Sequence, residues 1–328
     1  MVCTIGFFDG VHRGHQCLIR QVRDEALRRG ARSLLITFDR HPRSVFAPES
    51  VPQLLTTASE KQALLRATGV DDIFVLPFDR AMAALTAREF MQRVLKEQLG
   101  VDVLVIGYDH RFGRPLSNSR SEGFPEYQAY GKELGIEVVQ ARELEGEHVS
   151  SSAIRRALAD GDVATAARLL GRPYEWRGRV VHGHAVGRRL GFPTANLEAV
   201  EPGKVRPARG VYAAKVLLPA TDVAGTAAGR ARGTATDVAG TAAADTAAAG
   251  TGAVAMLNIG HRPTLDNGSE LSIEANLLDF CGDLYGQTLT LFFIARLREE
   301  RQFRSEAELA EQLQRDRAAA LAACNSTL

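Results

Sequence analysis

Residues 6–15 read GFFDGVHRGH and lie between a short apolar run, Val2 to Gly6, and an amphipathic segment, His15 to Arg29. The run predicts a strand and the segment predicts a helix. Backbone amides at the start of a helix bind phosphate, and a glycine there allows close approach of a nucleotide. The two histidines add donors for phosphate oxygens. The stretch therefore predicts a phosphate-binding loop; the alternative is that His12 and His15 only cap the helix.

The first 170 residues alternate apolar runs with amphipathic segments, which predicts a parallel sheet covered by helices. Pairs typical of a capping box, Ser59 with Gln62 and Thr86 with Glu89, mark two helix starts. A further helical pattern fills Ala153 to Leu170. Besides the first strand, we expect strands at Ser33–Phe38, Asp72–Leu76, Val101–Gly107 and Ile136–Ala141.

After Gly171 the pattern changes to β-rich segments separated by glycine and proline, which predicts a small, mostly antiparallel β-barrel or sandwich. A C-terminal helix is expected from Ser305 to Ala323, with Ser305 and Glu308 as its capping box. We place the domain boundary between 172 and 173, giving domains 1–172 and 173–328. The expected strands are Glu175–His182, Gly210–Leu218, Ala253–Ile259, Leu271–Phe280 and Thr288–Leu297.

The stretch at about 220–252 is an Ala/Gly/Thr/Asp tract in which TDVAGTAA occurs twice, at 221–228 and 236–243. It has no aromatic side chain and too few large aliphatic ones to offset the entropy lost on ordering. We predict a flexible low-complexity insertion between two barrel strands.

Composition excludes several classes of protein. The longest apolar runs are far shorter than the roughly 18 residues that a membrane span needs. A formal net charge of +1 gives no general attraction to nucleic acid or an anionic membrane. The four cysteines form no CxxC pair, so neither a disulfide framework nor a zinc site is expected. With no visible secretory signal, we expect a cytoplasmic protein that acts on small molecules.

Two further motifs have a physical reading of their own. Residues 149–155 read VSSSAIR, which puts hydroxyls at a helix start and Arg155 one turn later, a combination suited to triphosphate but also to a simple serine cap. Residues 178–196 are punctuated by glycine and end in PTAN, without the GK[ST] ending of a P-loop. This segment is either a phosphate loop or a glycine-rich connection.

FDGVHRGH at 8–15 resembles the H-x-G-H nucleotidyltransferases, and in particular the bacterial bifunctional riboflavin kinase/FMN adenylyltransferase (FAD synthetase) family. Other strings resemble the same family in order, and the resemblance covers nearly the whole chain apart from the tract. These strings are TFDRHPR at 37–43, GYDHRFG at 107–113, VSSSAIR at 149–155, the 178–196 segment, NIGHRPT at 258–264, IEANLLDF at 273–280 and LREERQF at 297–303.

The resemblance implies a Rossmann-like α/β nucleotidyltransferase domain followed by a riboflavin kinase β-barrel. It further implies phosphorylation of riboflavin to FMN in the second domain and adenylylation of FMN to FAD, with release of pyrophosphate, in the first. Both reactions use ATP, and Mg²⁺ is the expected metal. His12 and His15 would stabilise charge on the transferred phosphate, and Glu274 would be the general base that deprotonates the ribityl hydroxyl.

The remaining implied site residues fall into three groups. Those of the first ATP site are Gly6, Phe8, Asp9, Gly14, Asp109, Ser151, Ser152 and Arg155. Those of the kinase ATP site are Gly183, Gly187, Gly191, Thr194 and Asn196, the last two also as oxygen ligands of Mg²⁺. Those on the flavin side are Asp279, Phe280 and Arg298.

Two alternatives stay open at this point. One is a different H-x-G-H adenylyltransferase fused to an unrelated barrel, which would leave the motifs of the second half unexplained. The other is a non-enzymatic flavin or nucleotide sensor, which would bind the same molecules without turning them over.

Overall fold

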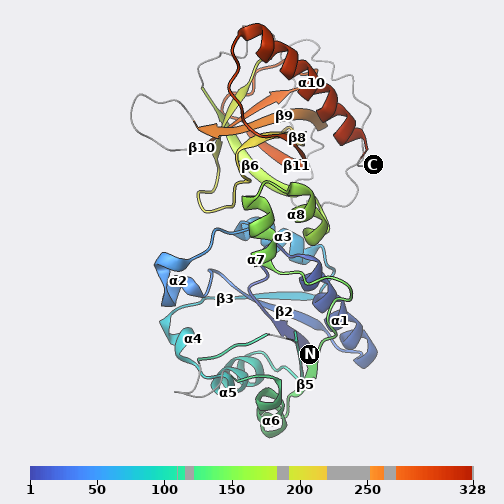
Figure 1. The fold of residues 1–328 in the computed structure, drawn as a ribbon. Coiled ribbons are helices and arrows are strands. Elements are labelled where there is room, and N and C mark those ends of the chain that lie inside the picture. The colour runs from blue at the N-terminus through green and yellow to red at the C-terminus, as the bar shows by residue number, and fades with distance from the viewer. Residues whose placement is uncertain (109, 115–121, 183–191, 220–251, 262–270, 327–328) are drawn as a thin grey trace. The chain divides into compact units, whose positions relative to one another are not determined.

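The computed structural model describes the 328 residues of the chain except 109, 115–121, 183–191, 220–251, 262–270 and 327–328. It contains two compact units, Met1–Ser151 and Ser152–Leu328. The first holds a parallel sheet with helices and the second a closed barrel with a C-terminal helix, so the predicted fold class is confirmed (Figure 1).

The sheet of the first unit has the strand order β3-β2-β1-β4-β5, and all its pairs are parallel. The chain builds outward from β1 in one direction and then returns to start β4 on the other side of β1. The carboxyl ends of β1 and β4 therefore frame the switch point where open α/β sheets bind ligands. The strands are β1 (Val2–Ile5), β2 (Ser33–Phe38), β3 (Asp72–Leu76), β4 (Val103–Ile106) and β5 (Glu137–Gln140).

Helices cover both faces of this sheet because side chains of each strand alternate between the faces. On one face, α1 (Arg13–Arg29) and α3 (Ala58–Arg66) pack on β1 and β2 through residues such as Ile19, Leu35 and Leu65. The other face is covered by α5 (Ala87–Phe90), the π-helical segment η2 (Met91–Gln98) and α6 (Phe124–Leu134). Short helical turns complete the unit: α2 (Arg43–Phe46), η1 (Pro48–Ser50) and α4 (Arg80–Ala84).

Of the two capping boxes predicted in the first unit, one is confirmed and one is wrong. The Thr86–Glu89 capping box is confirmed. The box predicted from Ser59 and Gln62 is wrong: Thr57 caps α3 and exchanges hydrogen bonds with Glu60. Thr57 is the last residue with extended backbone before the helix, whereas Ser59 already lies inside it. The helix therefore starts earlier and brings Lys61 into its second turn.

The helical stretch predicted over 153–170 consists of two helices. They are α7 (Ser151–Ala159) and α8 (Val163–Leu170). Gly161 between them has a φ of 76°, and the Asp162 side chain accepts a hydrogen bond from the Thr165 amide to cap α8. Glycine at this left-handed position and the new N-cap explain the break.

The second unit is a six-stranded barrel closed in the order β10-β7-β6-β11-β8-β9, with every described pair antiparallel. The sequence analysis did not predict β7, whose first two residues, Ala195 and Asn196, end the glycine-punctuated 178–196 segment. Helix α10 (Glu306–Asn325) packs on the barrel through Ala320 and Cys324 and is capped by Ser305, as expected. The return half of the predicted capping box is wrong, because the Glu308 carboxylate accepts from the backbone amide of Arg304 at 3.0 Å and not from that of Ser305. The strands are β6 (Tyr174–Val181), β7 (Ala195–Ala199), β8 (Gly210–Leu217), β9 (Gly252–His261), β10 (Leu271–Leu277) and β11 (Thr288–Arg298).

The low-complexity tract joins two strands whose facing ends are paired, Leu217 of β8 with Gly252 of β9. Deleting residues 221–249 leaves a connection short enough for a hairpin loop. We expect the free energy of unfolding to change by less than about 1 kcal/mol, because loop closure depends only weakly on length. Thermal and urea unfolding followed by circular dichroism measure this change, and a large drop would show that the tract contributes to the fold.

Candidate active sites

The GFFDGV loop after β1 has a strained backbone. Phe8 and Val11 have positive φ values of 55° and 40°, which L-residues and especially β-branched ones rarely adopt. Each such residue costs about 1–3 kcal/mol and persists only where the surrounding structure enforces it. Both side chains are buried against Ile19, Leu35 and Leu65. Packing against the α1–α3 face thus holds the loop in place.

The carboxylate of Asp9 fixes the same loop from within. It accepts hydrogen bonds from the backbone amides of Leu55 (3.0 Å) and Thr56 (3.1 Å) and from the Thr56 hydroxyl (3.2 Å). The Thr56 hydroxyl oxygen in turn accepts from the amide of Gly10 at 3.0 Å. Asp9, predicted for the phosphate site, is buried and directed at the segment that leads into α3.

His12 and His15 lie together at the start of α1. Their rings stack with centroids 3.6 Å apart, and His12 Nδ1 accepts a hydrogen bond from the His15 amide at 3.3 Å. His12 therefore does cap the helix, as the alternative proposed. Because Nδ1 is the acceptor, the neutral ring carries its proton on Nε2, where it is a donor for a second partner. Capping and phosphate binding are compatible roles for this side chain.

His15 is held neutral. Burial lowers its pKa well below the ordinary value of 6.5, and the neighbouring His12 and His110 lower it further. Its Nδ1 is a buried atom without a hydrogen-bond partner among the described residues. An anion bound here would raise the pKa of His15 by its negative charge, and its oxygens could accept a hydrogen bond from Nδ1.

The Ser-rich motif reaches the same loop. The Ser151 hydroxyl donates to the backbone oxygen of Asp9 at 3.0 Å. A side chain at Gly14 would meet His12 Nδ1 at 3.2 Å and the Val149 oxygen at 3.4 Å, so only glycine fits without a shift. A side chain at Gly6 would likewise lie 3.0 Å from the Phe8 ring. Ser151 of the Ser-rich motif therefore contacts the loop that follows β1.

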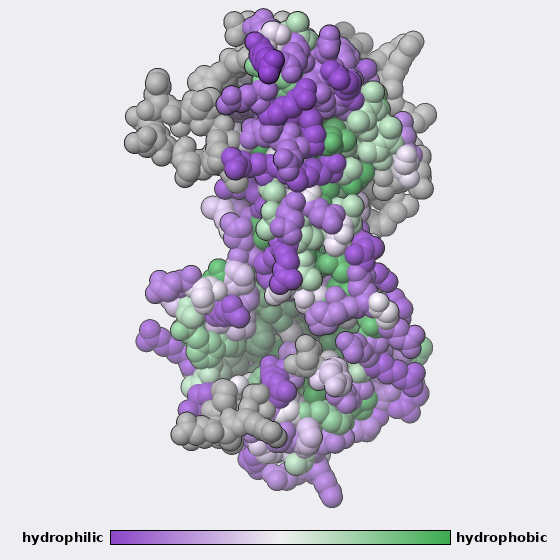
Figure 2. Space-filling model, in the orientation of Figure 1, coloured by the Kyte–Doolittle hydropathy of each residue, from purple (hydrophilic) through white to green (hydrophobic). Residues whose placement is uncertain are grey.

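Three further residues were predicted for this site, Ser152, Arg155 and Asp109. On α7, Ser152 is exposed and Arg155 is half-buried. Asp109 lies outside the described residues. Figure 2 shows that the visible face of the first unit is hollowed, with apolar residues inside the hollow.

The barrel carries a polar row across three adjacent strands. Glu274 of β10 lies directly opposite Asn196 of β7 on one side and Asn258 of β9 on the other. Directly opposed residues of antiparallel strands point to the same face, with Cβ atoms about 4.5–5.5 Å apart. The neighbours of Glu274 along β10, Ile273 and Ala275, are buried on the opposite face. Register therefore places the predicted base, Glu274, beside the predicted Mg²⁺ ligand Asn196. It also places Asn258, the first residue of the NIGHRPT motif, next to Glu274 on the other side.

The segment before β7 is hydrogen-bonded to β10, the middle strand of this row. The side-chain amide nitrogen of Asn276, Nδ2, donates to the backbone oxygen of Pro193 at 2.7 Å, which fixes the chain next to Thr194. Thr194 is half-buried. Gly183, Gly187 and Gly191 lie outside the described residues.

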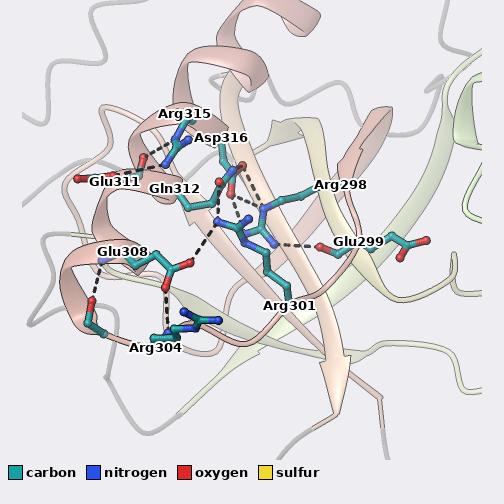
Figure 3. A network of polar contacts seen from close by, with 10 residues as sticks. Arg298, Glu299, Arg301, Arg304, Glu308, Glu311, Gln312, Arg315 and Asp316 are labelled. Atoms are coloured by element: carbon teal, nitrogen blue, oxygen red, sulfur yellow. Dashed lines mark hydrogen bonds and ion pairs between the residues drawn. The ribbon is translucent and has the colours of Figure 1, made fainter.

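The three predicted flavin-side residues lie at the ends of β10 and β11, and two of them pair with α10. Arg298 makes a bidentate ion pair with Asp316, which is buried, and Arg317 pairs with Asp279 at 2.6 Å. Figure 3 shows the Arg298–Asp316 pair within a larger polar network that joins α10 to the end of β11 and the segment between them. Phe280 is half-buried. Adjacent residues of one helix thus hold the guanidinium of Arg298 and the carboxylate of Asp279.

The described part of the chain shows neither a membrane-spanning helix nor a cluster of metal-binding side chains. No helix there is long and apolar enough to cross a membrane. No group of three or more histidine, cysteine, aspartate or glutamate side chains there is arranged to hold a metal ion, and this includes the surroundings of His12 and His15.

The chain thus combines a parallel α/β domain, with a histidine pair after β1, and an antiparallel barrel with a carboxylate–amide row. The FAD synthetase family profile matches residues 1–153, and the riboflavin kinase profile matches 170–324. A crystal structure described as that of a macrolide-efflux protein from Streptococcus pneumoniae is similar, with a TM-score of 0.77 and 30% identity over 97% of this chain and 93% of that one.

Curated relatives agree over nearly the full length. The bifunctional riboflavin kinase/FMN adenylyltransferase of Pseudomonas fluorescens is 36% identical over 98% of this chain and 92% of its own. The Escherichia coli K12 enzyme of the same name is 36% identical over 96% and 90%, and the Bacillus subtilis one 31% over 98% and 91%. The chain belongs to the family of bifunctional riboflavin kinase/FMN adenylyltransferases.

The hydrogen bonds of Asp9 predict a mainly structural effect of its mutation. Asp9→Asn keeps one acceptor oxygen but turns an N–H donor toward the amides of Leu55 and Thr56. Leaving such buried groups unpaired costs about 1–3 kcal/mol, so the midpoint of urea unfolding of the first unit should fall. Asp24→Asn, at an exposed position of α1, is the control. Unchanged stability of Asp9→Asn would show that the carboxylate is not what holds the loop.

Proposed function

We propose that FMN adenylylation takes place at the GFFDGVHRGH loop and riboflavin phosphorylation at the Asn196–Glu274–Asn258 row. The family has both activities, and its two profiles divide between the two halves of the chain. The profile match over 170–324 removes the alternative of an unrelated barrel. We keep the functional boundary at 172/173, between the αL residue Gly171 that ends α8 and the start of β6 at Tyr174.

The stacked histidine pair at the switch point carries the assignment of the first site. In this reaction an oxygen of the FMN phosphate attacks the α-phosphorus of ATP, and the bond to pyrophosphate breaks. Donors aimed at the transferred phosphate stabilise the charge that builds up there. His12 Nε2 is such a donor, and His15, neutral in the free site, gains a proton more readily beside an anion. Ser151, Ser152 and Arg155 would hold the remaining phosphates at the start of α7.

The position of Glu274 opposite Asn196 carries the assignment of the second site. The ribityl 5'-hydroxyl oxygen attacks the γ-phosphorus, ADP leaves, and the hydroxyl proton passes to the Glu274 carboxylate. Asn258, on the other side of Glu274, is placed to orient the carboxylate. Asp279, Phe280 and Arg298 would contact the flavin, with the first and third oriented by α10.

Mg²⁺ fits the donor set of the second site. The Thr194 hydroxyl and the Asn196 amide are hard oxygen donors of the kind that Mg²⁺ accepts, and Asn196 is buried beside the proposed base. When bound, the ion neutralises charge on the ATP phosphates.

We place both reactions in the cytoplasm. ATP is a substrate of each, and all four cysteines are free thiols. Incubation with riboflavin and Mg-ATP, followed by chromatography of FMN and FAD, distinguishes the enzyme from a sensor that binds without turnover.

Variants of the histidine pair should separate the two activities. His12→Asn keeps a good helix cap but removes the Nε2 donor. We expect FAD formation from FMN to fall by about 100-fold or more in this variant and in His15→Ala. FMN formation from riboflavin, measured in the same samples, should stay unchanged. Equal loss of both products in folded protein would argue against two independent sites.

Glu274→Gln tests the proposed base. The amide keeps the size and reach of the side chain but accepts no proton, so kcat for FMN formation should fall by about 100-fold or more while riboflavin affinity changes little. Glu198→Gln, two residues after Asn196 on β7 and exposed, is the matched control. A Glu274→Gln variant with the wild-type rate would rule the carboxylate out as the base.

A further inference from the structure

Lys61 is a buried lysine that none of the motifs includes. Its residue is 5% exposed, although lysine is rarely buried without a paired carboxylate. Its ammonium donates to the backbone oxygen of Phe38 at 2.9 Å and lies 4.1 Å from the centroid of the Phe7 ring. Phe38 ends β2 and Phe7 follows β1, so α3 places a positive charge at the edge of the sheet where the adenylylation loop begins.

The Phe7 ring lies next to the strained part of the loop. The ring also packs against the apolar core of the sheet and against His41, whose ring lies edge-on to it with centroids 4.9 Å apart. The Thr37 hydroxyl donates to the Phe7 backbone oxygen at 3.3 Å. The next residue, Phe8, has positive φ. Asp9 holds the far side of Phe8 through Leu55 and Thr56, and Lys61 holds the near side through Phe7. A cation over an aromatic face is attracted to it, most strongly where water is excluded.

We propose that Lys61 is a positioning residue of the adenylylation site, whose ammonium fixes Phe7 and thereby the strained loop that carries His12 and His15. This inference rests on the proposed placement of FMN adenylylation at that loop. It predicts that activity depends on the charge of Lys61 and not only on the space that the side chain fills.

The charge of Lys61 can be removed by pH as well as by mutation. Burial lowers its pKa from 10.5 to about 8, although Asp9 and Asp39 act in the opposite direction. The charged and titratable groups around it are those two carboxylates, His41 beyond the Phe7 ring, and Glu60 on α3, whose carboxylate accepts from the Thr57 amide. The ammonium is therefore present at neutral pH and largely lost by about pH 9.5.

The same shift sets the sign of the effect on stability. The unfolded chain holds this proton up to a higher pH than the folded one, so burying the ammonium destabilises the fold below about pH 8, and this penalty disappears as pH rises toward 10.5. Lys61→Met keeps the apolar stem and removes the charge. Its melting temperature at pH 7.5 should equal or exceed that of the wild type. A purely structural lysine would give the opposite result.

The test measures kcat/KM for ATP in FAD formation from pH 7 to 9.5, for the wild type, Lys61→Met and the exposed-lysine control Lys132→Met on α6. At pH 7 we expect Lys61→Met to be about 10- to 100-fold slower than the wild type, as for a misplaced reacting group. The two curves should converge above the pKa of Lys61, because the wild-type charge is then lost as well. FMN formation from riboflavin should be the same in all three proteins.

Other outcomes would overturn the proposal. A Lys61→Met variant with the wild-type rate at pH 7, or one that is equally impaired at every pH and melts at a lower temperature, would reduce Lys61 to a packing residue. His12→Asn in the same series separates the two levels of inference. If His12→Asn loses FAD formation while Lys61→Met does not, only the role of Lys61 fails; if His12→Asn keeps it, the placement of the site is wrong and the role of Lys61 fails with it.

Discussion

The proposed adenylylation site depends on the Asp9 carboxylate, which holds a loop in a conformation that its own backbone disfavours. Phe8 and Val11 have positive φ values, and the loop has no regular secondary structure to enforce them. Hydrogen bonds from Leu55 and Thr56 to Asp9 tie it to the start of α3, and buried packing of both strained side chains ties it to α1. Because His12 follows Val11 directly, the direction of its ring is set by this arrangement.

The second site depends on register instead of strain. Glu274 is paired on both sides, with Asn196 and with Asn258, and a slip of one residue would turn it to the opposite face of its strand. Barrel closure leaves no free edge at which β10 could shift. The polar row is thus as well defined as the barrel itself, although its residues are up to 78 positions apart in the sequence.

Local signals in the sequence predicted the fold class of both domains and picked out the motifs. Alternating apolar runs located the sheet strands, with Ser33–Phe38 and Asp72–Leu76 confirmed to the residue. Strand β7 was missed because its five residues form part of a polar, proline-containing stretch with little apolar signal. The capping box of α3 was placed two residues late because several Ser, Thr and Glu residues there satisfy the same spacing.

Contacts between distant residues could not be predicted from such signals. The sequence shows that Asp9 and Lys61 are charged but not that both are buried, since burial depends on the β1–β2–α3 packing. The sequence therefore pointed to Asp9 only as a residue of the first ATP site, and no motif singled out Lys61. Likewise, the pairing of Arg298 and Asp279 with neighbouring residues of α10 appears only once the helix is packed on the barrel.

The place of the low-complexity tract has a consequence for the history of the gene. Its ends meet at Leu217 and Gly252, and Gly252 lies six residues before Asn258 on β9, about 20 Å along an extended strand. Codons added at this hairpin therefore lengthen the chain far from the polar row. The octapeptide TDVAGTAA, present at 221–228 and again at 236–243, is the trace that such a duplication leaves. An insertion at this connection leaves the polar row in place, so selection on the reaction has no reason to remove it.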